Sequence, residues 1–297
     1  MANMKALRGR IKSVTNTRQI TKAMKMVSAA KLRRATDRAV QSRAYSSRMN
    51  RMVSSLAPSM LDNPGAPTLL IGRPGEHKRI ELVVFTADRG LCGSFNSGII
   101  RSTRERIARL QAEGLQVSLT CVGRKGHDVL KRQYGKLIRK VHTDVSRHMT
   151  FEYLEKEVGR ELVKAFNEDK FDACYIVFNT FKSAMSQELT WRQLIPAPVD
   201  QPEEGAETEA AASYMYEPEE EEILEAILPR NLSMQIYQAQ AESEASEHGA
   251  RMTAMDSASR NANEMIRKLR IKFNRTRQAA ITTELMEIIG GAESLKN

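Results

Sequence analysis

The feature that most constrains this chain is a run of 47 residues, from 11 to 57, without a glycine or a proline. Because these two residue types most strongly disfavour helix interiors, the run predicts one helix of about 70 Å. Its apolar positions alternate by three and four, as in a coiled-coil seam, in two sets separated by a shift of phase near Ile20: Met4, Leu7, Ile11, Val14, then Tyr45, Met49, Met52, Leu56. We expect this N-terminal coiled-coil helix to span residues 1–57.

A second long helix is predicted in residues 223–297, where Gly249 is the main interruption. Its three-four alternation covers about four heptads and is the best periodic signal in the chain. The seam positions are Met252, Met255, Ser259, Ala262, Ile266, Leu269, Phe273, Thr276 and Ala280. Two helices that flank one inserted domain must be antiparallel if they pair.

The C-terminal helix is expected to be longer than its mate by about 13 residues, roughly 20 Å. This tip carries the apolar stripe Ile281, Leu285 and Ile288. A single helix with such a stripe is not stable bare in water, so we expect a sleeve formed by other proteins.

Between the helices, residues 78–195 have the pattern of an α/β domain. Strand-like runs alternate with helical patterns: strands at 81–85, 117–122 and 173–178, helices at 99–113 and 151–167. This order predicts a mostly parallel sheet covered by helices. The fold class is therefore α/β, with a three-layer Rossmann-like domain inserted between long terminal helices that form an antiparallel coiled coil. Residues 196–222 read as an acidic loop.

Charge is distributed unevenly along the chain. Residues 1–57 hold fourteen lysines and arginines and one acid, whereas residues 200–225 hold eleven acids and no lysine or arginine. This asymmetry predicts contact with a charged surface and leaves nucleic acid, anionic lipid and acidic protein as candidates. The longest apolar runs are far shorter than the roughly 20 residues that cross a bilayer, so membrane association is expected only through partners. No targeting segment is evident at the start of the sequence.

No motif for catalysis, a cofactor or a metal is found. The three cysteines lie far apart and are expected to be buried and inert. The segment 88–96 lies between a strand and a helix, but it lacks the lysine and the glycine spacing of nucleotide-binding loops and reads as a tight turn. Residues 123–126 have the GxxG form of an RNA-clamping loop, so a basic coiled-coil nucleic-acid-binding protein is the alternative function. Its weakness is that aromatic residues for base stacking make up only 5% of the chain.

Three stretches together resemble the gamma-subunit family of F-type ATP synthases. They are RIKSVTNTRQITKAMKMV from residue 10, DRGLCG at 88–93 with Phe95 and Asn96, and RQAAITTELME at 277–287 followed by GAES at 291–294. The last is the most specific, and its signature residues are Ile281, Thr282, Glu284, Glu287, Gly291, Ala292 and Ser294.

The resemblance implies a rotor shaft that couples proton flow to ATP synthesis or hydrolysis and has no catalytic site of its own. Its partners are then the alpha, beta, epsilon and c-ring subunits, not nucleic acid. By the same resemblance, Met24 is expected to pass beta's acidic lever region, and Arg277, Gln278 and Thr282 are expected to contact beta's catch loop.

The resemblance also places the opposite end of the chain. The sequence YMYEP from residue 214 is similar to the family's ring-facing stretch, so Tyr214 and Glu217 are expected to face the c ring or epsilon. Together with the absence of a targeting segment, the family implies a peripheral location at the cytoplasmic face of a bacterial plasma membrane.

Overall fold

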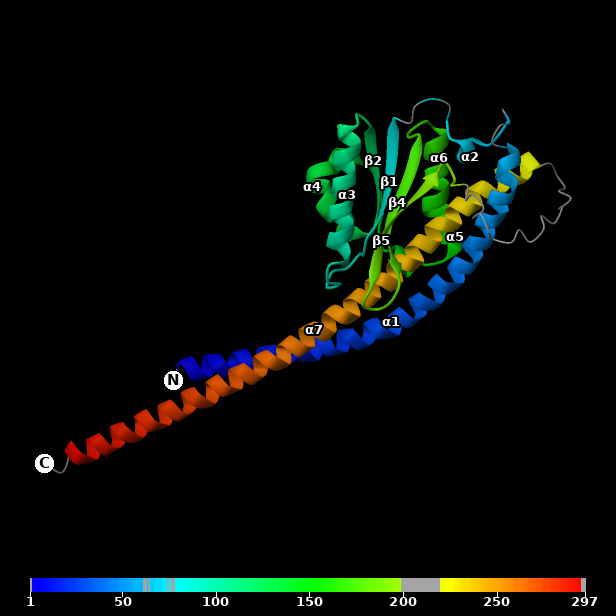
Figure 1. The fold of residues 1–297 in the computed structure, drawn as a ribbon. Helices are drawn as coiled ribbons and strands as arrows, with labels where there is room; N and C mark the ends of the chain where they lie inside the picture. Colours follow the sequence, from blue (N-terminus) through cyan, green and yellow to red (C-terminus); the bar gives the residue numbers. More distant parts are fainter. Residues whose placement is uncertain are drawn as a thin grey trace. The chain divides into compact units, whose positions relative to one another are not determined.

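The computed structural model describes residues 2–60, 63, 65–73, 75, 78–198 and 220–294. They form two compact units. The helical unit contains the described residues before 30 and after 250, and the sheet unit contains those from 30 to 250. The two terminal helices, α1 (Ala2–Met60) and α7 (Glu220–Ser294), belong to both units (Figure 1).

The sheet unit alternates strands with helices. In chain order the elements are α2 (Thr68–Ile71), β1 (Arg79–Phe85), α3 (Phe95–Ala112), β2 (Gln116–Val122), α4 (Arg124–Tyr134), η1 (Gly135–Leu137), β3 (Ile138–His142), η2 (Val145–Arg147), α5 (Phe151–Leu154), the π-helical turn η3 (Glu155–Gly159), α6 (Arg160–Asn167), β4 (Ala173–Phe181) and β5 (Gln187–Ile195). The prediction of an α/β domain between two long helices is confirmed.

The five strands form one sheet in the order β3-β2-β1-β4-β5. β1 is central and pairs in parallel with both β2 and β4, with Ile80 opposite Val117 on one side and Ala173 on the other. β5 is antiparallel to β4 and forms an edge. Because six of the seven residues of β1 are buried, this strand is the axis of the core.

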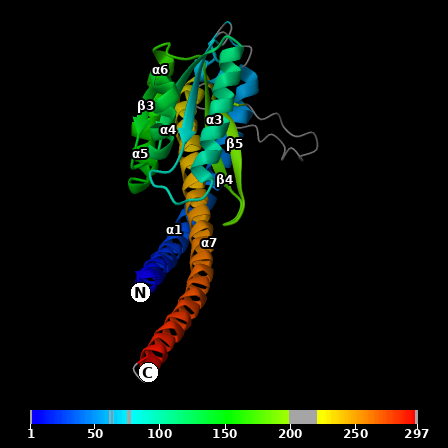
Figure 2. The ribbon, with the colours of Figure 1, turned by 90° about the vertical axis from the view of Figure 1, so that its left-hand side faces the viewer.

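Helices cover both faces of the sheet (Figure 2). On one face, α3 and α4 pack on Val84 and Cys121, and α3 also covers Leu82. On the other face, α5, α6, α1 and α7 enclose a core that includes Phe85 and Phe178. The successive residues of β1 thus face opposite helical layers, as the two-residue period of a strand requires.

Strands β3 and β5 were not predicted. Both are edge strands with polar sequences, IRKVH and QELTWRQLI, and most of their residues are only half-buried. The apolar runs that reveal central strands are absent from half-solvated edges. Helix α1 was predicted to end at residue 57, but it includes Pro58 and ends at Met60.

The seam of α1 also differs from its prediction. Ile20, Tyr45 and Met52 are exposed, and no shift of phase occurs. Buried or half-buried residues instead recur at one continuous three-four spacing: Leu7, Ile11, Val14, Arg18, Thr21, Lys25 and Ser28 in the helical unit, then Leu32, Ala35, Ala39, Ser42, Ser46, Met49, Val53 and Leu56 in the sheet unit. Small and polar residues fill the seam, so a search for apolar residues alone misplaces it.

Candidate functional site

The helical unit is where the sequence places its most specific motif. Along its part of α7, all nine predicted seam positions from Met252 to Ala280 are buried or half-buried. Met255, Ala262 and Ile266 are the most enclosed, with 5 to 7% of their surfaces exposed. A stripe of this spacing is the form of a helix that packs along another helix.

Three contacts join α1 to α7 within this unit. The Arg8 guanidinium lies 5.7 Å from the centre of the Phe273 ring. Arg18 Nη1 donates to Asn263 Oδ1 at 3.0 Å. These contacts tie positions near the start of the chain to positions far along α7.

The third contact is an ion pair between Lys25 Nζ and Asp256 Oδ1 at 2.5 Å. Its hydrogen bond holds the pKa of Asp256 below the ordinary carboxylate value. Both partners are partly exposed, so the pair contributes orientation more than stability.

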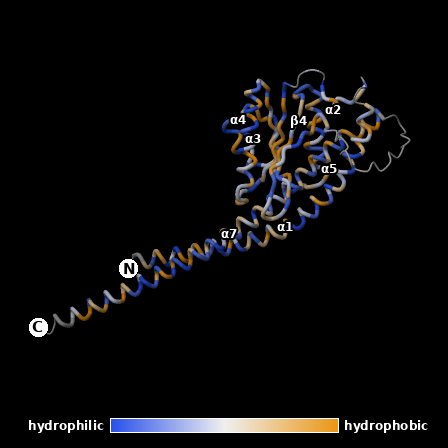
Figure 3. The backbone as a smooth tube through the Cα atoms, viewed as in Figure 1, coloured by the Kyte–Doolittle hydropathy of each residue, from blue (hydrophilic) through white to orange (hydrophobic). Residues whose placement is uncertain are grey.

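Beyond the seam, α7 presents a helical tip at residues 281–291, where every residue is exposed. Its large apolar side chains are half to two-thirds exposed: Ile281 48%, Leu285 54%, Met286 65%, Ile288 67% and Ile289 53%. Figure 3 shows apolar positions recurring along these last turns of α7. An exposed apolar stripe of this kind indicates an interaction surface.

The predicted partner-contact residues lie in this unit. Arg277 and Gln278 are exposed, and Thr282 is exposed and donates from Oγ1 to the Gln278 carbonyl at 2.9 Å. Met24 is half-buried on α1. Three of the four side chains are therefore exposed on α7, and the fourth is half-buried on α1.

Five of the remaining predicted residues belong to the end of α7, and two lie outside the described residues. Glu284, Glu287 and Gly291 are exposed on the tip, and Ala292 and Ser294 belong to its last turns. Tyr214 and Glu217 lie outside the described residues, as does most of the predicted acidic loop.

The 88–96 segment is a turn. Leu91 and Gly93 adopt positive φ angles of 63° and 58°, and Asn96 Oδ1 accepts from the Ala87 amide at 2.9 Å. A groove of about 730 Å³ lies beside it and includes Arg101, Arg104 and Lys125.

The GxxG segment has a structural role. Gly123 has a φ of 104°, and a Cβ there would lie 1.9 Å from the Thr86 carbonyl oxygen. Gly126 approaches the same threonine, whose Oγ1 accepts from the Gly126 amide at 2.9 Å. Close packing on Thr86, next to the end of β1, therefore accounts for both glycines: Gly123 lies against its backbone and Gly126 against its side chain.

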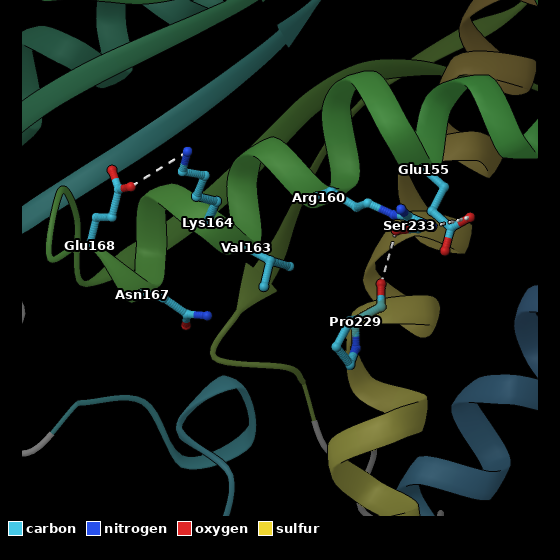
Figure 4. Close-up of a pocket in the computed structure, with 8 residues that line it drawn as sticks. All are labelled: Glu155, Arg160, Val163, Lys164, Asn167, Glu168, Pro229 and Ser233. Carbon is cyan, nitrogen blue, oxygen red and sulfur yellow. Dashed lines mark hydrogen bonds and ion pairs between the residues drawn. The ribbon is translucent and has the colours of Figure 1, made fainter.

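A second groove, of about 390 Å³, runs between α6 and α7 (Figure 4). Its charged side chains pair along its walls, Lys164 with Glu168 and Arg160 with Glu155, both at 3.8 Å. Ser233 donates to the Pro229 carbonyl at 2.9 Å within α7. The charged groups that line this groove thus bind one another.

Three observations bear on cofactors and membranes. All three cysteines are free and buried, as predicted, and burial raises the pKa of Cys121 to about 12. In the described part of the chain, no group of three or more His, Cys, Asp or Glu side chains is arranged to hold a metal ion. None of the helices described has a long enough apolar stretch to span a membrane.

Sequence reasoning missed the buried charge clusters, of which two matter most here. Glu81, in the middle of β1, is fully buried and binds Arg139, which also pairs with Glu161. Glu242 on α7, also buried, pairs with Arg43 on α1. The sequence held one signal for the Glu81 cluster, which is the acid at the start of the apolar run ELVVF. It held no signal for the pair of Glu242 and Arg43.

Comparison with known proteins identifies the family. A family model described as ATP synthase matches residues 3–295. The ATP synthase gamma chain of Magnetococcus marinus is 64% identical over 296 residues, which cover 100% of both chains. That of Paramagnetospirillum magneticum is 48% identical and covers 99% of this chain and 100% of its own.

Solved structures agree in fold. The central stalk and c-ring structure of the Tetrahymena thermophila mitochondrial ATP synthase matches with 25% identity and a TM-score of 0.60, over 81% of this chain and 99% of that one. A chain of the Euglena gracilis mitochondrial ATP synthase in rotational state 3 matches with 21% identity and a TM-score of 0.70, over 99% and 95%. The chain therefore belongs to the ATP synthase gamma chain family, the central-shaft subunits of a complex whose catalysis takes place elsewhere.

Proposed function

We propose that α1 and α7 of the helical unit form an antiparallel coiled coil that turns inside a ring of three alpha and three beta subunits. Rotation driven by proton flow through the c ring would reach the beta subunits through this shaft. Its asymmetry would push each beta subunit in turn through loose, tight and open nucleotide sites. This chain would transmit the rotation, and the beta subunits would catalyse ATP synthesis and hydrolysis.

The single observation that carries this proposal is the matched register of the contacts between α1 and α7. From Arg8 to Arg18 is ten residues up α1, and from Phe273 to Asn263 is ten residues down α7. The next step, to Lys25 and Asp256, is seven residues in each helix. Equal and opposite steps are the rule for antiparallel helices that stay in contact, and seven residues is one heptad.

This register also accounts for the exposed tip. Carried on from Arg8 opposite Phe273, the start of α1 at Ala2 falls opposite residue 279, next to Ala280, where the seam of α7 ends. The exposed residues from 281 onward thus lie beyond the part of α7 that the described residues of α1 face. A surrounding protein sleeve would cover Ile281, Leu285 and Ile288 and remove their apolar surface from water.

We infer that Met24, Arg277, Gln278 and Thr282 contact beta. Arg277 and Gln278 lie next to the tip and off the seam, so their side chains are available to a partner. The net positive charge of α1 favours an acidic surface on that partner. From the likeness of the YMYEP stretch to the family's ring-facing sequence, we also infer that Tyr214 and Glu217 contact the c ring or epsilon.

The complex would be located at the cytoplasmic face of a bacterial plasma membrane, which this chain would reach through its partners. The alternative, a nucleic-acid-binding protein, has lost its main support because the GxxG segment is explained by packing on Thr86. Recovery of alpha, beta and epsilon in a pull-down supports the rotor, whereas recovery of nucleic acid without them contradicts it.

The contact residues are tested by the double variant Arg277→Ala, Gln278→Ala, reconstituted with the other subunits. Alanine keeps the helix intact, and the lost polar contacts are worth about 1.5–3 kcal/mol, so turnover should fall by about tenfold or more while assembly survives. The matched control is Glu264→Ala, Lys268→Ala, which removes an exposed ion pair on the same helix. Wild-type rates of ATP hydrolysis and gradient-driven synthesis in the first variant would refute the assignment.

A further inference from the structure

Strand β4 is longer than its parallel neighbour. β1 pairs with β4 from Ile80 opposite Ala173 to Val84 opposite Val177, whereas β4 continues to Phe181. The end of β4 therefore extends past the paired part of β1, and its backbone groups on that side need other partners.

Side chains from the two terminal helices supply these partners. The Phe181 amide donates to Glu242 Oε2 at 2.9 Å, and its carbonyl accepts from Arg43 Nη2 at 2.8 Å. Two residues earlier, the Asn179 carbonyl accepts from Ser246 Oγ at 2.9 Å. Side chains of α1 and α7 thus occupy the place of a missing strand and bind the sheet by its backbone.

Glu242 is the centre of this arrangement. Its side chain is 1% exposed, and it receives two hydrogen bonds from Arg43, with Nη2 to Oε2 at 2.7 Å. The hydrogen bond to Glu242 raises the pKa of Arg43 above its ordinary value. A buried carboxylate is tolerated only when it is fully bonded, and here the Phe181 amide completes its bonds.

The helix also approaches the sheet unusually closely just beyond this point. A Cβ at Gly249 would lie 3.2 Å from the Ala184 Cα and 3.4 Å from the Phe181 ring. All residues from 239 to 249 are buried. The turn between β4 and β5 thus rests directly on the backbone of α7 (Figure 1).

We propose that Glu242, held by Arg43 and by the Phe181 peptide groups, is the positioning residue through which torque passes between the terminal helices and the β-sheet. The inference rests on the proposed rotor function and names the internal contact that serves it. Hydrogen bonds between a helix side chain and a strand backbone are directional and lengthen when the helix turns or slides, so they add a specific resistance to that of the interdigitated apolar packing between α7 and the sheet. Rotation of α7 against the sheet would stretch these bonds directly.

The test uses the reconstituted complex and the apolar variant Arg43→Leu, Glu242→Leu. Replacing an ion pair that has a buried member by apolar residues is often neutral for stability, although the Phe181 amide and carbonyl lose their partners here. Subunit stoichiometry and melting temperature are therefore compared with wild type first, so that anchoring is separated from folding. A particle attached through Glu105→Cys on the exposed side of α3 reports the angle of the sheet unit while the beta sites are locked by ADP. We expect a larger angular variance than in wild type, with unloaded ATP hydrolysis unchanged.

The matched control is Lys182→Ala, Glu188→Ala, which removes an exposed ion pair from the same β4–β5 hairpin and should leave the variance unchanged. If the angular variance of the apolar variant equals that of wild type and rotation is normal, the anchoring role of Glu242 is refuted and the rotor function is not. A wild-type chain that never enters the ring complex would instead contradict the rotor function.

A second variant keeps the test valid if the apolar one does not assemble. Glu242→Gln preserves shape but removes the charge, and the Phe181 amide should then exchange its hydrogen about tenfold faster in the complex. Exchange at the wild-type rate would overturn the role of Glu242.

Discussion

The variant Arg139→Met tests how much the buried charges of the sheet stabilise the fold. Glu81 is fully buried and accepts from Arg139 Nη2 at 3.1 Å, from Arg139 Nε at 3.2 Å and from Thr120 Oγ1 at 2.5 Å. Arg139 also pairs with Glu161. Methionine retains much of the arginine's apolar stem but leaves the Glu81 carboxylate without a cation.

The magnitude follows from this geometry. Removing one partner of a buried ion pair costs about 3–5 kcal/mol, because the remaining charge is uncompensated. For a unit of this size each kcal/mol lowers the melting temperature by about 2–4 °C, so a loss of about 6–20 °C is expected. Glu81→Gln with Arg139→Met removes both charges and keeps an acceptor for Thr120, so this double variant should recover more than half of the loss.

The assay is thermal unfolding of the full chain followed by tryptophan fluorescence. Trp191 is the single tryptophan, lies on β5 and donates from Nε1 to Ser102 Oγ at 2.9 Å, so it reports on the sheet unit. A loss below about 1 kcal/mol for Arg139→Met would refute the reasoning, since a surface pair behaves that way. A double variant no more stable than the single one would also refute it.

Three further outcomes are expected. Deleting residues 200–212, an acidic segment outside the described residues, should spare assembly; failure of the shortened chain to incorporate would make the segment a docking element. The three buried cysteines should resist alkylation at pH 8 until the chain unfolds, because burial raises the pKa of Cys121 to about 12 and that of Cys174 well above its ordinary value; rapid labelling of native protein would contradict this. Hydrogen bonds from Arg79 lower the pKa of Asp172 from its ordinary 3.8. Because the folded pKa is depressed, this stabilisation is fully present above pH 3.8 and is lost as the pH falls through the folded value. Asp172→Asn should therefore lower the free energy of unfolding by about 1.5–3 kcal/mol at pH 7 and by progressively less in acid. A difference in urea unfolding that does not change with pH would be inconsistent with this.

Several features were decided by the sequence alone. Freedom from glycine and proline over residues 11–57 leaves little alternative to a long helix, and α1 covers all of it. The three-four spacing from Met252 to Ala280 identifies the buried stripe of α7 because apolar residues mark it. The exposed tip follows from the length of the same pattern. These are local properties, and a helix repeats them every turn.

Other features depended on the tertiary structure. Thr21, Ser28 and Ser42 belong to the seam of α1 although nothing in their polarity predicts burial. Small residues are buried where another element comes close, and that element is far away in the sequence. For the same reason, the polar edge strands β3 and β5 could not be recognised from their own residues.

The charged anchors are the clearest case. Gly249 interrupts the helical pattern in the sequence, yet α7 continues through it, because the missing side chain admits Ala184. Glu242 reads as one more acid in a polar stretch until Arg43 and the Phe181 peptide groups surround it. A buried charge is stable only through specific partners, and only the folded chain brings together partners that lie 61 and 199 residues away.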